Sequence, residues 1–409
     1  MRDDDSIRDR RSFLQAAGLL VAAGVSDGFL NPAWAKTVAL PFANGERPLV
    51  AYPQKRPLIR QTTRPPQLET PFAVFKEGVL TPNDAFFVRY HLANVPLDID
   101  PASYKLNVSG LVERPLSLSL SELRSEFKET EIIAVNQCSG NSRGFVEPRV
   151  GGGQLGNGAM GNAKWRGIPL KLVLDKAGVK AGAVQVTFKG LDAPLLPTTP
   201  EFVKALNIDH ARDGEVLLAY SMNDADLPLL NGFPLRLVVP GYFGTYWVKH
   251  LTEINVIDHE FQGFFMGKGY RIPDNDCGCV EPGTAAKATR PIGKMVVRSF
   301  VTSLEQGAAI RVGQAFPIHG IAFDGGSGIH AVDLSVDDGQ SWQSAKLGRD
   351  YGRYSFRPWQ FELKLRSKGS HRLLVRATAN DGQVQPLKPT WNPSGYRRNV
   401  IESLDVVAI

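Results

Sequence analysis

The sequence has few cysteines, and their spacing excludes several kinds of metal site. Three are present among 409 residues, at Cys138, Cys277 and Cys279. No Cys-x-x-Cys pair has the spacing of a structural zinc site, and no Cys-x-x-Cys-His motif is available for covalent attachment of a c-type haem. Cys277 and Cys279 either form a local disulfide or remain reduced, and in an oxidising compartment the odd count leaves one thiol over.

Long apolar segments and dense basic segments are also missing. After the N-terminal region no run is long and apolar enough to cross a bilayer, so we expect no membrane span in the mature chain. Lysine and arginine do not alternate with aromatic residues in any run, so we expect no nucleic acid as a partner. The formal net charge is +6, and such a modest positive excess suits an anionic small substrate or an acidic protein partner.

The N-terminal residues are typical of an export signal. Arg10 and Arg11 are followed by the apolar stretch 16–25 and by a small-x-small tripeptide at 33–35. This order predicts a twin-arginine signal peptide over residues 1–35 and a mature protein in the bacterial periplasm. That route carries proteins that are already folded, commonly because a cofactor is inserted in the cytosol. The signal therefore indicates a bound cofactor.

The remaining chain divides into three regions by composition. Residues 36–75 are rich in proline and polar groups, which predicts an extended N-terminal arm. Residues 76–285 predict an α+β domain, with short apolar strands and two helices. These helices cover 119–127, which begins with a serine cap, and 169–179, which ends at glycine. Residues 286–409 have turn signals every eight to twelve residues and predict an immunoglobulin-like β-sandwich that lacks the usual cysteine pair.

Cys138 lies in an unusual place for a structural thiol. It follows the apolar run 132–135 and belongs to the polar turn NQCSGNSRG at 136–144. A thiolate is a soft metal ligand, but no second cysteine or histidine lies within a few positions to complete a zinc or iron–sulfur site. Three roles stay open for it: a nucleophile, a single protein ligand to a metal that a cofactor already holds, or a plain buried thiol.

Several arginines accompany this thiol in the sequence. Arg89 and His91 follow a strand-like run, Arg143 lies five residues past Cys138, and Arg357 stands between aromatic residues. A guanidinium always stays charged and presents a fork of donors that fits an oxyanion. The spacing by itself does not show whether these side chains meet Cys138.

Several blocks of the sequence resemble the sulfite oxidase family of molybdenum enzymes. They occur in the family's order over residues 75–409: TPNDAFFVRYHLANVP, VNQCSGNSRG, WRGIPL, NGFPLRLVVPGYFGTYWVKHL, KGYRIP, DDGQSWQSAKL and PTWNPSGYRRN. With an export signal and no cytochrome b5 domain, the chain is most similar to the periplasmic bacterial sulfite dehydrogenases of this family. The resemblance implies a molybdopterin-binding domain of the sulfite oxidase type followed by a sandwich that forms dimers.

The resemblance also implies a cofactor and the residues that hold it. The cofactor is molybdenum bound to molybdopterin, a pyranopterin dithiolene. Cys138 matches the one protein ligand to molybdenum, and His91 matches a cofactor-contacting histidine. Arg236 and Lys249 match the residues that hold the cofactor phosphate. Asn231 stands where many family members have histidine, and its amide can hydrogen-bond the edge of the pterin.

The implied reaction is the oxidation of sulfite to sulfate with release of two electrons. Arg89, Arg143 and Arg357 match the arginines that hold the substrate, and Tyr270 matches the tyrosine near the metal. The chain has no haem of its own, so the implied electron acceptor is an external c-type cytochrome. A homodimer is also implied. The alternatives are another reaction of the same fold, nitrate or sulfoxide reduction, or a non-catalytic exported binding protein.

Overall fold

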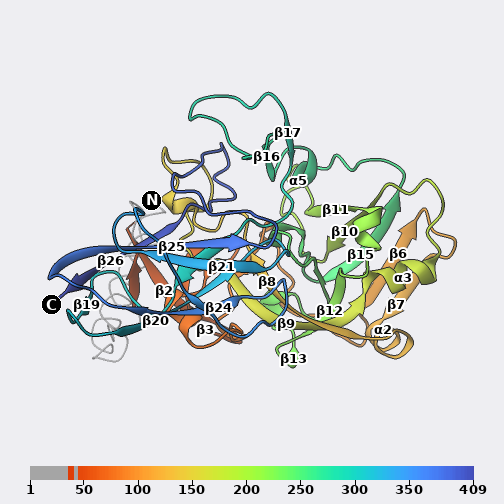
Figure 1. Cartoon of the computed structure of the whole chain (residues 1–409). Coiled ribbons are helices and arrows are strands. Elements are labelled where there is room, and N and C mark those ends of the chain that lie inside the picture. Colours follow the sequence, from red (N-terminus) through yellow and green to blue (C-terminus); the bar gives the residue numbers. More distant parts are fainter. Residues whose placement is uncertain (1–35, 41–44) are drawn as a thin grey trace, which may run out of the picture.

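The computed structural model describes residues 36–40 and 45–409, and the predicted signal peptide at 1–35 lies outside them. Strands dominate the described chain. Figure 1 shows the sandwich strands of the C-terminal part, in teal to blue, on one side and the helices and most strands of residues 105–257 on the other. This arrangement confirms the predicted fold class, an α+β domain followed by a β-sandwich. No helix of the described residues is long and apolar enough to span a bilayer.

Residues 36–75 are more ordered than the extended arm that the sequence predicts. Four antiparallel strands form there, in the order β1 (Thr37–Ala39), β2 (Glu46–Tyr52), β3 (Lys55–Thr62) and β4 (Gln67–Glu69), and β5 (Val88–Arg89) completes the sheet beside β4. This proline-rich region also contributes apolar residues to a small separate core, in which Leu58 and Leu68 pack with Val88, Tyr90 and Leu230. This packing holds the end of β5 against the rest of the domain.

Two further sheets make up the α+β domain. The first has the strand order β11 (Val203–Asn207), β10 (Gln185–Gly190), β15 (Leu251–Ile257), β6 (Lys105–Gly110) and β7 (Leu116–Ser119). The second has the order β13 (Ala225–Asp226), β12 (Leu217–Met222), β9 (Met160–Pro169) and β8 (Thr130–Gln137), with β14 (Arg236–Val238) paired to β12. Cys138 comes directly after β8, so this second sheet positions it.

Local sequence determines the two longer helices. In α2 (Leu120–Glu126) the hydroxyl of Ser119 accepts from the Glu122 N–H and the Glu122 carboxylate accepts from the Ser119 N–H, a complete capping box. Helix α3 (Leu170–Ala177) ends at Gly178 with φ of 72°, a conformation that glycine adopts without strain. Both helices confirm the predicted ones. The short helices are α4 (Ile208–Ala211), α5 (Phe264–Gly267), and the 3₁₀ turns η2 (Phe72–Lys76), η3 (Arg143–Phe145), η4 (Leu229–Asn231) and η5 (Gly244–Tyr246).

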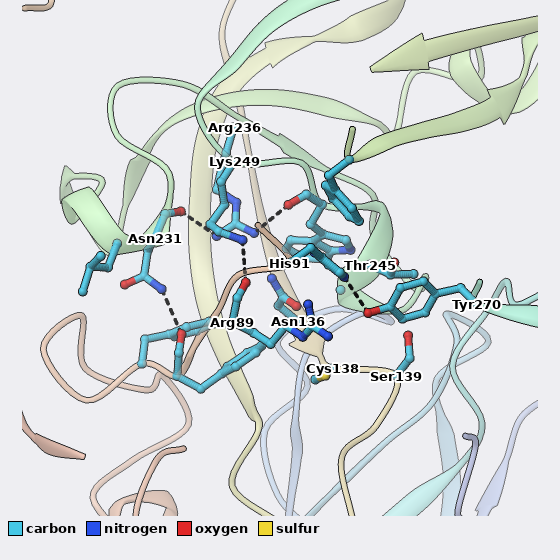
Figure 2. A pocket seen from close by; sticks show the side chains of 16 residues that line it. Arg89, His91, Asn136, Cys138, Ser139, Asn231, Arg236, Thr245, Lys249 and Tyr270 are labelled. Atoms are coloured by element: carbon cyan, nitrogen blue, oxygen red, sulfur yellow. Dashed lines mark hydrogen bonds between the residues drawn. The ribbon is translucent and has the colours of Figure 1, made fainter. Parts of the chain in front are cut away.

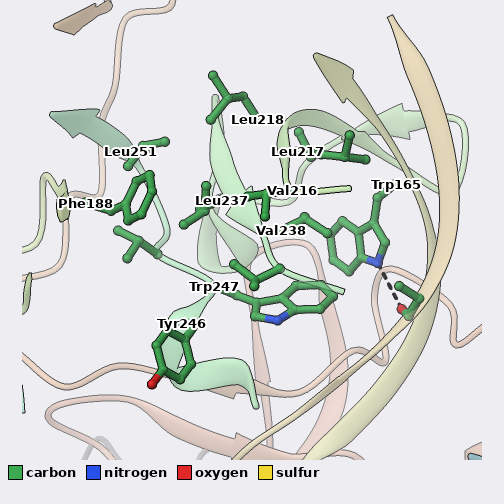
Figure 3. Packing of buried hydrophobic residues seen from close by; sticks show 14 of the residues in the cluster. Trp165, Phe188, Val216, Leu217, Leu218, Leu237, Val238, Tyr246, Trp247 and Leu251 are labelled. Atoms are coloured by element: carbon green, nitrogen blue, oxygen red, sulfur yellow. Dashed lines mark hydrogen bonds between the residues drawn. The ribbon is translucent and has the colours of Figure 1, made fainter. Parts of the chain in front are cut away.

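A tryptophan-centred core lies beneath the second sheet (Figure 3). The rings of Trp165 and Trp247 meet edge to face with centroids 5.5 Å apart, and both are fully buried among Leu217, Leu237 and Val238. The indole N–H of Trp165 donates to a backbone carbonyl of β8 at 3.0 Å. Aromatic pairs of this geometry stabilise a core beyond the area that they bury. The core therefore holds β8, β9 and β14 in a fixed relation.

The C-terminal sandwich consists of two sheets. One has the order β18 (Arg298–Val301), β20 (Phe316–Phe323), β24 (Arg357–Leu363) and β23 (Lys346–Leu347), and the other β19 (Ala308–Ile310), β26 (Glu402–Ala408), β25 (Gly369–Ala379), β21 (Ile329–Ser335) and β22 (Gln343–Ser344). A hairpin of β16 (Arg271–Pro273) and β17 (Thr289–Pro291) connects the two domains. In its loop Cys277 and Cys279 form a disulfide, the first of the two states left open by the sequence.

The two domains share buried contacts. Phe300, Phe323 and Phe356 of the sandwich belong to the same apolar cluster as the core of the α+β domain. Arg298, with no exposed surface, donates to the Ser142 hydroxyl at 3.0 Å and pairs with Glu402 at 2.6 Å. Ser142 directly precedes Arg143. The sandwich therefore packs against the turn that carries a predicted site residue.

Candidate active site

Most of the predicted site residues line one pocket (Figure 2). It lies where the ends of β5 and β8 meet the segment between η4 and β15. Seven of its lining residues are ones that the sequence singles out: Arg89, His91, Cys138, Asn231, Arg236, Lys249 and Tyr270. They come from four stretches of chain that are far apart in sequence, so only the fold brings them together.

Cys138 is held at the wall of this pocket by the turn after β8. Its backbone N–H donates to the Ala159 carbonyl at 2.9 Å, and its own carbonyl accepts from the Asn141 N–H at 3.0 Å. The thiol is free and 8% exposed. A buried thiol that still faces a pocket is available as a ligand to a bound group, and the turn leaves it little freedom to move away.

Arg236 and Lys249 form a cationic end of the pocket. Arg236 donates to the Asn231 carbonyl at 2.7 Å, and its guanidinium carbon lies 4.9 Å from the ring centre of Trp165. The ammonium of Lys249 donates to the Arg89 carbonyl at 2.8 Å. Burial lowers the pKa of Lys249 to about 7 and the pKa of Arg236 to about 9. An anion between the two side chains would stabilise their charged forms, so this end fits a phosphate.

Several polar atoms in the pocket wall are buried without a hydrogen-bond partner. They are Asn136 Oδ1, Ser139 Oγ, Thr245 Oγ1 and Arg236 Nε. Unpaired buried polar groups are costly, and four of them around one pocket indicate a polar ligand there. Gly244 packs closely against this wall, because a Cβ at this position would come within 2.3 Å of Asn136 Oδ1.

Asn231 and Lys55 pair at the edge of the pocket. The Asn231 amide donates to the Phe87 carbonyl at 3.0 Å, and its oxygen accepts from the buried ammonium of Lys55. Lys55 also donates to the Asn83 carbonyl at 2.6 Å, and burial lowers its pKa to about 7. The sequence does not single out Lys55, because it belongs to the segment that reads as an extended arm.

His91 and Tyr270 form a neutral pair. Their Nε2 and hydroxyl oxygen are 2.5 Å apart, and the His91 ring stacks on Phe202 at a centroid distance of 3.7 Å. Burial, followed by the charge of Arg89, lowers the pKa of His91, and burial raises the pKa of Tyr270. Tyr270 also has a φ of 58°, an unusual backbone conformation for a bulky residue. The local fold therefore directs this hydroxyl to the site.

Arg143 reaches Cys138 from a second, adjoining pocket of about 240 Å³. Arg89, Cys138 and Tyr270 line both pockets. The guanidinium of Arg143 donates to the Ser394 carbonyl at 2.9 Å and to the Gly153 carbonyl at 3.2 Å. Neither pocket has an aspartate or glutamate in its wall. The space in front of Cys138 is therefore cationic and suits an anion.

Arg357 does not line either pocket, unlike Arg89 and Arg143, so its role at the substrate stays a prediction. It begins β24, and its guanidinium pairs with the exposed Asp350 at 2.8 Å. Strand β24 lies between β20 and β23 within the sandwich, and Arg357 is absent from the walls of both pockets. The sandwich contributes to the site through another segment, the chain before β26.

That segment supplies site residues that the sequence did not assign. Pro393, Ser394 and Tyr396 line the pocket of Arg143. The Tyr396 ring stacks on Tyr270 with centroids 5.4 Å apart and planes inclined by 7°, and the Arg143 guanidinium lies 5.0 Å from its centre. The block PTWNPSGYRRN carried the family resemblance, but nothing in its letters indicated contact with Arg143. Asn136, Ser139 and Thr245 were missed for the same reason.

Known protein families match both domains of the chain. The oxidoreductase molybdopterin binding domain family matches residues 91–265, and the Mo-co oxidoreductase dimerisation domain family matches residues 289–406. The chain is 34% identical to the sulfite oxidase of Gallus gallus over 369 residues, which cover 86% of this chain and 78% of that protein. It is 33% identical to the mitochondrial sulfite oxidase of Homo sapiens over 390 residues, covering 91% and 69% of the two chains.

A solved structure shares the fold of the whole chain. The sulfane dehydrogenase SoxCD from Paracoccus pantotrophus superposes with a TM-score of 0.71 at 22% identity and covers 94% of this chain and 93% of that one. The pocket described above fits the cofactor that the matched domain binds. It offers a thiolate for a soft metal, two cations for a phosphate, and unpartnered polar atoms for the pterin ring system.

Proposed function

Because the chain belongs to the sulfite oxidase family of molybdopterin oxidoreductases, we propose that it oxidises sulfite to sulfate and passes the electrons to an external acceptor. The observation that carries this proposal is the convergence of Arg89, Arg143 and Tyr270 on Cys138 in pockets without a carboxylate. Such a space favours a small oxyanion next to a soft metal ligand.

The cofactor is molybdenum bound to molybdopterin, as its binding domain implies. In this proposal Cys138 ligates the metal, Arg236 and Lys249 hold the phosphate, and Asn136, Ser139 and Thr245 hydrogen-bond the pterin. When bound, the cofactor supplies a metal that takes two electrons from sulfite and passes on an oxygen that originates from water. The Trp165–Trp247 core beneath Arg236 keeps the phosphate end rigid.

Arg89 and Arg143 bind the sulfite oxygens and hold the sulfur toward the metal. Both positions are preorganised. Arg143 donates to the carbonyls of Ser394 and Gly153, and Arg89 donates to the Tyr90 carbonyl at 2.8 Å. Fixed charges that face a developing charge lower the barrier without reorganisation. The neutral pair of Tyr270 and His91 adds a hydroxyl that orients substrate or water without changing the charge of the pocket.

We propose the bacterial periplasm as the location of the enzyme, and a cytochrome and a second copy of the chain as its partners. The twin-arginine signal supports a periplasmic enzyme. A c-type cytochrome suits it as the acceptor, because such proteins receive electrons through small, transient encounters. The dimerisation domain supports a homodimer.

Two measurements on the purified protein test this function. Metal analysis should find about one molybdenum per chain, and sulfite should reduce cytochrome c or ferricyanide in its presence. The Cys138→Ser variant should fold but lose turnover, because it removes the soft ligand. Sulfite oxidation at the wild-type rate by this variant would defeat the proposal, and nitrate reduction in place of sulfite oxidation would redirect it.

A further inference from the structure

A third hollow of about 260 Å³ leads from the surface to the site. It shares Arg89, His91 and Tyr270 with the pocket of Cys138, and Tyr396 with the pocket of Arg143. Its own outer wall consists of Pro65, Phe264, Phe265 and Gly269. A molecule that enters here therefore reaches the same arginine that faces the thiol.

The wall of this hollow is aromatic from the surface inward. Phe264 is 46% exposed and meets Phe265 edge to face, with centroids 5.0 Å apart. Phe265 in turn lies 6.3 Å from Tyr270, and Tyr270 stacks on Tyr396. Gly269 lies next to the Phe264 ring, since a Cβ at this position would be 3.4 Å from the ring edge. We call this surface, defined by Phe264, Phe265, Tyr270 and Tyr396, the aromatic mouth.

The mouth and the site together have two chemical ends. The inner end holds the guanidinium groups of Arg89 and Arg143, and the third predicted arginine, Arg357, is paired with Asp350 elsewhere. The outer end offers ring faces and no carboxylate. This arrangement can hold an anion whose charged end meets the guanidinium groups and whose apolar substituent contacts the rings.

We propose that the aromatic mouth admits aryl sulfinates, R–SO₂⁻, and that the site oxidises them to sulfonates. A sulfinate is a sulfite in which a carbon replaces one oxygen, so its sulfur keeps the lone pair that reacts. The reaction is R–SO₂⁻ + H₂O → R–SO₃⁻ + 2 H⁺ + 2 e⁻: one S–O bond forms, two O–H bonds of water break, and the cofactor receives the electrons. The proposal rests on the proposed function of the same site.

The size of the hollow supports an aryl substituent. A cavity of about 150 Å³ is large enough to hold benzene, and this one is larger. With the sulfinate oxygens on Arg89, the ring of the substrate would lie along Tyr396, Phe265 and Phe264. A methyl substituent would leave the outer two rings without contact.

The first test compares three substrates with the purified holoenzyme and ferricyanide as acceptor. Sulfite, benzenesulfinate and methanesulfinate are supplied separately, and benzenesulfonate is identified by mass spectrometry. We expect turnover of benzenesulfinate with a kcat/KM about fivefold above that of methanesulfinate. A preparation that oxidises sulfite but not benzenesulfinate overturns this inference and leaves the proposed function standing. Oxidation of benzenesulfinate without oxidation of sulfite supports this inference and excludes sulfite as the substrate. If neither compound is oxidised, this inference and the proposed function are both overturned.

The second test removes the outermost ring. The Phe264→Ala variant should lower kcat/KM for benzenesulfinate about fivefold and leave sulfite oxidation unchanged. Leu196→Ala is the matched control, because Leu196 is 62% exposed and does not line the mouth. Calorimetric titration with benzenesulfonate gives a readout independent of turnover, and its Kd should rise by the same factor in Phe264→Ala only. Equal effects of the two variants, or an equal loss with sulfite, overturn the inference.

Discussion

At the scale of single residues, the site depends on how firmly each arginine is held. Arg143 is fixed by the Ser394 and Gly153 carbonyls, whereas Arg357 pairs with an exposed aspartate. We expect Arg143→Gln to lower kcat/KM for sulfite by about 10² to 10³, the usual effect of losing one preorganised donor. Arg357→Gln should stay within about twofold of wild type. Steady-state kinetics normalised to molybdenum content would measure both, and equal losses would place Arg357 in the site after all.

Lys204 provides a pH-dependent prediction at the same scale. It is fully buried, donates to the Phe265 carbonyl at 2.7 Å, and has a pKa that burial lowers to about 7 from 10.5. Between these values the unfolded chain binds more protons than the folded one, so this group makes stability rise with pH. The stability of Lys204→Met relative to wild type should therefore fall by about 2 kcal/mol from pH 7 to pH 9. Urea unfolding at both pH values measures it, and a constant difference would contradict it.

At the scale of elements, the segment before β26 acts as a rigid bridge to the site. The Asn392 side chain accepts from the Ser394 and Tyr396 N–H groups, both at 3.2 Å, and donates to the Tyr396 carbonyl at 2.8 Å. Asn392→Ala should cost about 1–3 kcal/mol and also raise the KM for sulfite, because the loop would no longer hold Arg143. Ser119→Ala, in the capping box of α2, should cost about 1 kcal/mol without any kinetic effect. Unchanged kinetics in Asn392→Ala would show that the bridge is dispensable.

At the scale of the whole molecule, Arg298 couples the two domains. Its removal leaves the Ser142 hydroxyl without this donor and Glu402 with Arg398 as its remaining partner. We expect Arg298→Met to lower the free energy of unfolding by about 3–5 kcal/mol and to reduce sulfite turnover, because Ser142 precedes Arg143. Arg372→Met, which breaks an exposed pair with Asp405, should cost less than about 1 kcal/mol. Scanning calorimetry compares the two, and similar melting temperatures would argue against the coupling.

How much of the fold could be predicted from the sequence depends on how far apart along the chain the interacting residues lie. Helix α2 was predictable because its cap lies within four residues, and α3 because a glycine ends it. The sheet over residues 36–75 was not, because its strands are stabilised by contacts of Leu58 and Leu68 with residues such as Leu230, far along the chain. Proline content predicts local backbone conformation, but it does not predict burial of a side chain against residues far along the chain.

By itself the sequence determined the chemistry that is available: a cysteine in a polar turn, arginines for an oxyanion, and the blocks that mark the family. Only the tertiary structure decided which of these groups meet. It brought Arg89, Arg143 and Tyr270 to Cys138, left Arg357 with Asp350, and added Ser394 and Tyr396. The physical reason is that side-chain chemistry is a property of each residue, whereas convergence depends on strand register and domain packing, which are set by contacts between distant parts of the chain.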